Sequence, residues 1–201
     1  MVRDLKSVLG MDLATRESGF CFIPAGWDGD FGALKFDGVG YDLLGKIPER
    51  SKLHAMMNAA KVAIRMIRQY EPDVLAVEDY AFSRQSSSTT MQAEIGGVVK
   101  SQILLGLDLV PGKVASTGAR KFLTGGLRGK RKGDVEAGIK ALPSKQQVKN
   151  FLNNRGMVFD TDDQMDAFVV AYYTYCVVNE IQCRFTPIEE HEQIGRRRKN
   201  R

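Results

Sequence analysis

The chain is poor in the residues that build disulfide scaffolds, Cys/His zinc sites and membrane spans. It has three cysteines, Cys21, Cys176 and Cys183, and two histidines, His54 and His191. The cysteine number is odd, no CxxC spacing occurs, and neither histidine has a partner for metal or triad chemistry. The longest apolar runs are far too short to cross a bilayer, and the stretch MVRDLKSVLG lacks the apolar core of a signal peptide. These absences predict a protein of the reducing cytoplasm.

The composition is that of an ordinary globular domain, with 43% apolar and 26% charged residues. At 201 residues the chain is long enough for one domain with a substantial core. We expect that domain to occupy residues 1–185 and residues 186–201 to form a basic C-terminal tail. The tail either adds nonspecific affinity for DNA or serves only solubility.

Positive charge is concentrated in one segment. Between Lys113 and Arg155 the chain has eleven Lys or Arg and two acids, a local balance of +9 within a total of +5. A polyanion is the obvious partner for such a segment, although a charge run can also be only a solvated surface. Residues 125–142 combine glycines and cations without helical or strand periodicity, which indicates a basic flap.

Hydrophobic periodicity predicts a five-stranded sheet with helices around it. Strands are expected over 7–14, 17–24, 32–40, 73–80 and 109–117, and helices over 49–70, 91–104, 117–124, 144–155 and 162–182. The polar stretch 83–90 is expected to be a loop. The first three strands form an antiparallel meander, and the last two follow helices and therefore run parallel to their neighbours. The predicted fold is α/β, with a mixed sheet of three antiparallel and two parallel strands flanked by helices.

Four acids that are far apart in the sequence fall where this fold would bring them together. Asp12 lies toward the end of the first strand and Glu78 ends the strand 73–80, and ligands gather at the carboxyl ends of such strands. Asp163 and Asp166 are three residues apart at the start of the last helix, so they share one face of it. Taken singly, Asp12 could start a turn and Asp163 or Asp166 could cap the helix. Jointly the acids favour a site.

Converging carboxylates repel one another and need cations to be stable as a cluster. Carboxylates and water are the ligands that Mg²⁺ and Mn²⁺ prefer, and Mg²⁺ keeps coordination positions open for phosphate oxygens. Two such ions about 3.5–4 Å apart would clamp the attacking water and the leaving oxygen of a phosphodiester. The acids permit this chemistry, but their spacing does not prove it.

Three stretches resemble motifs of the RuvC-type Holliday junction resolvases, which belong to the ribonuclease H-like superfamily. GMDLATRESGF looks like the first-strand motif, VLAVEDYAF resembles the strand that ends in a metal-binding glutamate, and SKQQVKNFLNNRG followed by DDQMDAFVVAYY is similar to the basic helix and the last helix. The order and separations agree over about residues 7 to 180. Leu13-Ala14 departs from the usual Pro-Gly, and residues 125–142 look like an insertion, as in phage-type (bacteriophage) members.

The resemblance implies a ribonuclease H-like fold and a homodimer whose two sites nick opposed strands of a four-way junction. It implies that Asp12, Glu78, Asp163 and Asp166 are catalytic carboxylates that hold two Mg²⁺ ions, for which Mn²⁺ can substitute. Basic family residues that contact the phosphate backbone match Lys145 and, less directly, Arg120 and Lys121. Further DNA-binding residues are expected in the flap and beside the site: Arg128, Lys130, Arg131, Lys132, Lys149, Tyr80 and Phe82. The two aromatic rings could stack on a base at a branch point or fold back onto the core.

We therefore expect a Mg²⁺-dependent, structure-specific DNA endonuclease, a crossover junction endodeoxyribonuclease that resolves Holliday junctions and extends to other branched DNA. A metal-activated water would attack the phosphorus and leave 5′-phosphate and 3′-hydroxyl ends. The alternatives are a nuclease of the same fold for flaps, forks or RNA·DNA hybrids, and a noncatalytic junction-binding protein. The expected partners are branched DNA and a second copy of the chain, with no membrane and no nucleotide cofactor, in the cytoplasm of a bacterium or a phage-infected host.

Overall fold

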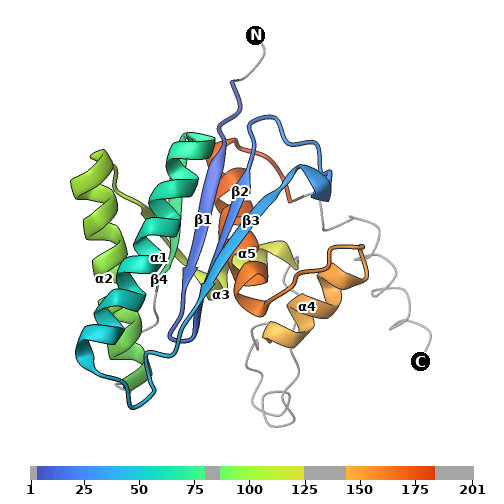
Figure 1. Cartoon of the computed structure of the whole chain (residues 1–201). Coiled ribbons are helices and arrows are strands. Elements are labelled where there is room, and N and C mark those ends of the chain that lie inside the picture. The colour runs from blue at the N-terminus through green and yellow to red at the C-terminus, as the bar shows by residue number, and fades with distance from the viewer. Residues whose placement is uncertain (1–3, 80–86, 125–143, 184–201) are drawn as a thin grey trace, which may run out of the picture.

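The computed structural model places one β-sheet between two layers of helices (Figure 1). The structure describes residues 4–79, 87–124 and 144–183. The strands are β1 (Val8–Leu13), β2 (Glu17–Ile23), β3 (Lys35–Gly40), β4 (Val74–Asp79) and β5 (Gly112–Ala115). The helices are α1 (Glu49–Tyr70), α2 (Ser87–Leu107), α3 (Ser116–Leu123), α4 (Lys145–Asn153) and α5 (Asp162–Val178), with a short 3₁₀ turn, η1, at Phe31–Ala33.

The sheet has the strand order β3-β2-β1-β4-β5, with β1 in the centre. The β1–β2 and β2–β3 pairs are antiparallel, whereas β1–β4 and β4–β5 are parallel. The expected mixed sheet of three antiparallel and two parallel strands is therefore confirmed. In the β1–β4 register Met11 pairs with Val77, so the next residues along the two strands are Asp12 and Glu78.

Each face of the sheet has its own apolar core. Side chains alternate between the two faces along a strand. Leu9 and Met11 of β1 pack in the core beneath α1 and α2, whereas Val8 belongs to the core beneath α5. Gly10 contacts α5 directly. Because both faces are covered, β1 is buried over its whole length, which explains its continuous apolar sequence.

Helix α5 is apolar almost all round because it is buried along most of its length, not only on one stripe. On one side it packs on the sheet, and on another it meets α3, where Phe122 and Tyr173 pack edge to face at 5.3 Å between ring centroids. Trp27, in the chain after β2, packs edge-on against Phe168 and Tyr172 of the helix. Helix α5 is thus held from several directions.

Several element boundaries differ from the expectation for local reasons. Helix α2 begins at Ser87, so the predicted loop 83–90 is wrong over its last four residues. Small hydroxyl residues suit a first helical turn as well as a loop. Strand β5 is shorter than predicted and begins after Pro111, which lacks an amide proton. Strand β3 begins three residues late because Asp30 caps the 3₁₀ turn by accepting the Gly32 amide at 2.9 Å.

Helix α1 spans the predicted residues 49–70, and α3 and α4 differ from prediction by one or two residues at an end. Helix α5 ends at Val178, four residues before the predicted end. Within the described ranges, no helix has the length and apolar character needed to cross a membrane. The flap 125–142 and the tail 186–201 lie outside the described residues, and the domain boundary at 185 stays a prediction.

Candidate active site

Two of the four acids meet at the carboxyl ends of β1 and β4. Asp12 is 4% exposed, and its carboxyl group makes a side-chain hydrogen bond with Glu78 of the neighbouring parallel strand. Asp12 shares the α5 face of the sheet with Val8 and Gly10 because it is an even number of residues away from both. The central pair of the predicted site is therefore present.

The start of α5 supplies the other two acids. Thr161 caps the helix, and its hydroxyl accepts the Gln164 amide at 3.2 Å. Asp163, in the first turn, makes a side-chain hydrogen bond with Asp12, and Asp166, in the next turn, is 4% exposed. The structure thus brings all four predicted acids together between the end of β1 and the start of α5.

The cluster carries unfavourable electrostatics as it stands. Burial raises the pKa of Asp12 well above its usual value, and the charges of Glu78, Asp166 and Asp163 raise it further. Burial also raises the pKa of Asp163, with Glu17 and Asp166 adding to the effect, although attraction from Lys145 opposes it. The raised pKa values of Asp12 and Asp163 mark a place where a cation would stabilise the ionised carboxylates.

Two protein cations bind Asp166 from different helices. Arg120 of α3 donates from Nη2 to Oδ1 of Asp166 at 3.0 Å, and Lys145 of α4 reaches Oδ2 at 2.7 Å. Burial acts to lower the pKa of Lys145, but attraction from Asp166, with smaller contributions from Asp163 and Asp12, raises it overall. Lys145 is therefore charged at neutral pH.

Neighbouring basic residues take different positions. Lys149, one turn after Lys145 on α4, donates to Asp162 at 2.8 Å, and this ion pair is exposed to solvent. Lys121 follows Arg120 on α3 and is exposed. Arg120 Nε is buried and lacks a hydrogen-bond partner among the described residues. Of the predicted DNA-binding cations that the structure describes, Arg120 and Lys145 contact the acid cluster.

The donor set fits a hard divalent cation. Within the described parts of the chain, no three His, Cys, Asp or Glu side chains are arranged as ligands of one metal ion. The two oxygens of Asp166 are instead directed to Arg120 and Lys145. Asp12, however, is buried and makes no ion pair with any described residue. Carboxylates in this setting are the ligands that Mg²⁺ and Mn²⁺ prefer.

The remaining predicted DNA contacts fall outside the described residues. These are Tyr80 and Phe82 after β4, and Arg128, Lys130, Arg131 and Lys132 of the flap. Their roles stay predictions.

Sequence reasoning missed two residues beside the acids, Tyr41 and Glu17. The hydroxyl of Tyr41 donates to the Ala14 carbonyl at 2.9 Å and also hydrogen-bonds Ser18, so it braces the turn between β1 and β2. Burial raises the pKa of Tyr41, and the charges of Asp12 and other acids raise it further, so the hydroxyl stays protonated. That Tyr41 and Glu17 lie beside the acids becomes evident only from the pairing of β2 with its neighbouring strands.

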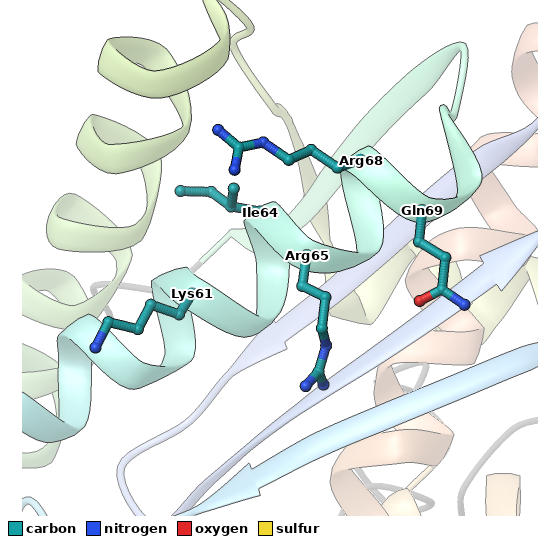
Figure 2. A pocket seen from close by; sticks show the side chains of 5 residues that line it. All are labelled: Lys61, Ile64, Arg65, Arg68 and Gln69. Atoms are coloured by element: carbon teal, nitrogen blue, oxygen red, sulfur yellow. The ribbon is translucent and has the colours of Figure 1, made fainter.

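An open hollow of the described surface lies elsewhere. It has a volume of about 580 Å³ and is lined by five side chains of α1, among them Lys61, Arg65 and Arg68 (Figure 2). Arg65 pairs with Asp37 of β3. Because α1 covers the sheet face opposite to α5, this hollow is separate from the acids.

Comparison with known proteins agrees with this arrangement at the level of the fold. No protein-family model and no curated protein sequence matches the chain. RuvC of Thermus thermophilus is similar with a TM-score of 0.59 and 15% identity, over 86% of this chain and 95% of that chain. The same protein in complex with a Holliday junction substrate gives a TM-score of 0.59 at 12% identity, with the same coverage.

A third structure, the yeast mitochondrial Holliday junction resolvase Ydc2, covers 87% of this chain and 80% of its own at 15% identity. Its TM-score of 0.47 is too low to support an argument. At these identities a structural likeness establishes how the chain folds and not what it does. The chain has the ribonuclease H-like fold of the RuvC resolvases.

Proposed function

We propose that the chain is a metal-dependent DNA endonuclease that cleaves branched DNA, with the four-way junction as its main substrate. The observation that carries the proposal is the meeting of Asp12, Glu78, Asp163 and Asp166 at one end of the sheet. The fold shared with RuvC, which has been solved with a Holliday junction substrate, supports the substrate class.

The four acids would hold one or two divalent cations, which polarise the phosphate and lower the pKa of water. The protein's own residues would do the remaining work. Asp163 is half-buried with a raised pKa, and a raised pKa makes its carboxylate a better proton acceptor. Asp12 and Glu78 lie on adjacent strands of the buried sheet, so these two metal-binding carboxylates would be held on a rigid support.

Arg120 and Lys145 would neutralise the phosphate that enters the site. Both are already beside Asp166, and Arg120 Nε is a buried donor without a described partner. A phosphate oxygen is a suitable acceptor, because arginine donors bind phosphate in well-defined geometry. Lys145 keeps its charge because of its acidic surroundings. These two cations would therefore orient the scissile phosphate over the acids.

The test is cleavage of a panel of end-labelled substrates in Mg²⁺, in Mn²⁺ and in chelator. The panel comprises a four-way junction, a three-way junction, a flap, a fork, an RNA·DNA hybrid and a linear duplex. The proposal predicts paired nicks in opposed strands of the four-way junction, with 5′-phosphate ends, which chelator abolishes and Mg²⁺ restores.

Paired nicks require two sites, so we also propose that the active species is a homodimer, to be measured by light scattering. Faster cleavage of a flap, a fork or a hybrid would move the protein to the alternative nuclease class. Junction binding without cleavage in either metal would make it a noncatalytic binding protein. The cytoplasmic location stays a prediction.

A further inference from the structure

The start of α5 lies so close to β2 that no side chain fits between them. Gly19 of β2 pairs with Asp12 of β1 in the antiparallel register. A Cβ placed on Gly19 would lie 2.2 Å from the carbonyl oxygen of Asp163, 2.3 Å from its carbonyl carbon and 2.7 Å from the Gln164 nitrogen. All three atoms belong to the helix backbone, so the contact cannot be relieved by rotating a side chain.

Helix α5 also cannot slide away easily, because it is held along its length. A Cβ on Gly10 of β1 would lie 2.5 Å from the Ala171 nitrogen and 2.6 Å from the Ala167 oxygen, so the middle of the helix is equally close to the sheet. On another side of the helix, Trp27 packs edge-on against Tyr175 at 6.2 Å between ring centroids. Packed interiors of this kind resist displacement.

We propose that Gly19 is a positioning residue of the active site, whose lack of a side chain sets the separation between Asp163 and Asp12. This inference rests on the proposed function, because the purpose of that separation is to let both carboxylates bind the same divalent cations. The backbone of Asp163 lies against Gly19, and Asp12 is the cross-strand neighbour of Gly19. One glycine therefore adjoins both acids.

The size of the effect follows from the contact distances. Real Cβ contacts are essentially never shorter than 3.0 Å and are ordinary from 3.4 Å, so the methyl group of Gly19→Ala, built at 2.2 Å, would have to move apart from the Asp163 backbone by about 0.8–1.2 Å. Metal sites hold their ligand distances to within about 0.2 Å, and Mg²⁺ demands near-ideal octahedral geometry. The displacement exceeds that tolerance several times over, so metal binding should be lost before the fold is.

The chain offers a matched control in Gly40. It lies on β3 of the same sheet and pairs with Glu17 of β2. A Cβ placed on Gly40 would meet no atom of the described residues within 4 Å, its immediate chain neighbours aside. Gly40→Ala therefore makes the same chemical change in a strand without crowding the helix. It should leave metal binding and melting temperature as in the wild type.

The primary measurement is Mn²⁺ binding to the DNA-free protein, followed by electron paramagnetic resonance, with near-ultraviolet circular dichroism to verify the fold. We expect wild type and Gly40→Ala to bind Mn²⁺ alike and Gly19→Ala to bind at least about tenfold more weakly while folded. Equal Mn²⁺ affinity of folded Gly19→Ala and wild type would overturn the inference and leave the proposed function standing. Absence of Mn²⁺ binding in the wild type would overturn the proposed function itself.

A second variant tests the separation without crowding the helix. Asp163→Glu lengthens the side chain by one C–C bond, about 1.5 Å, so it should weaken Mn²⁺ binding in the wild-type background at least tenfold. In the Gly19→Ala background the same change should restore part of the lost Mn²⁺ affinity. The effect of Asp163→Glu on Mn²⁺ affinity would then have opposite signs in the two backgrounds, which a purely structural role of Gly19 would not produce. If Gly19→Ala does not fold, the test is Asp163→Glu in the wild-type background. Mn²⁺ affinity equal to that of the wild type in Asp163→Glu would overturn the inference.

Discussion

The same isosteric change should have opposite effects on stability at two acids of the site. In the metal-free protein, Asp12→Asn replaces a buried carboxyl group whose ionised form is repelled by Glu78 and Asp163, so it removes the cost of ionising this group. Asp166→Asn removes the acceptor of Arg120 and Lys145 and leaves two cations without their carboxylate. Asp12→Asn should therefore stabilise the protein and Asp166→Asn should destabilise it.

The magnitudes follow from the partners. Repulsion between two carboxylates in contact costs about 1–4 kcal/mol between the dielectric limits of water and a protein surface, so Asp12→Asn should gain an amount in that range. Hydrogen bonds to charged groups contribute about 1.5–3 kcal/mol each. Because the Lys145 side chain is 37% exposed, its share is discounted for solvent screening, and Asp166→Asn should cost about 2–4 kcal/mol.

The assay is thermal melting in chelator at pH 8 and low salt, where about 1 kcal/mol corresponds to roughly 2–4 °C for a chain of this size. The pKa of Asp12 is raised in the folded state, so this group favours folding at low pH and loses that contribution as pH rises. The advantage of Asp12→Asn should therefore vanish below about pH 3, where Asp12 is protonated in folded and unfolded chains alike. Shifts of the same sign for both variants at pH 8 would refute the assignment of partners.

Three further outcomes are expected. Asp12→Asn should reduce junction cleavage by at least about 10³-fold while junction affinity, measured by gel shift in Ca²⁺, stays equal or rises; full-rate cleavage would remove Asp12 from the mechanism. Lys145→Ala should lower the slope of log affinity against log salt by about one unit, and an unchanged slope would show that Lys145 contacts no phosphate. Tyr41→Phe should destabilise the protein by about 1–2 kcal/mol in urea melts, since the Ala14 carbonyl and Ser18 lose a partner; no loss would mean that the brace is unimportant.

The sheet and the acid pair at its centre could be predicted because the strands that carry them are buried on both faces. The stretches VLGMDL and VLAVED are apolar runs with acids only near their carboxyl ends, a pattern typical of central parallel strands. Once β1 and β4 are neighbours, the meeting of Asp12 and Glu78 follows from register alone. The spacing of Asp163 and Asp166 on a helix was likewise readable from the sequence.

Other features depend on tertiary contacts that have no local signal. Asp162 and Asp163 are adjacent in sequence, yet Asp162 pairs with Lys149 while Asp163 bonds Asp12. One residue step turns a helix by about 100°, so which acid faces the site depends on how α5 lies on the sheet. The hydrogen bond from Tyr41 to Ala14 depends on where the chain runs after β3, and hydrophobic periodicity does not predict that path.

Asp166 also joins two parts of the chain on either side of the basic segment. Arg120 belongs to α3, which ends at Leu123, and Lys145 begins α4, so one carboxylate holds the last helix before that segment and the first helix after it. A ligand that competed for the oxygens of Asp166 would release Arg120 and Lys145 together. One exchange of partners at Asp166 would therefore act on the end of α3 and the start of α4 together, although the two helices lie more than twenty residues apart in the sequence.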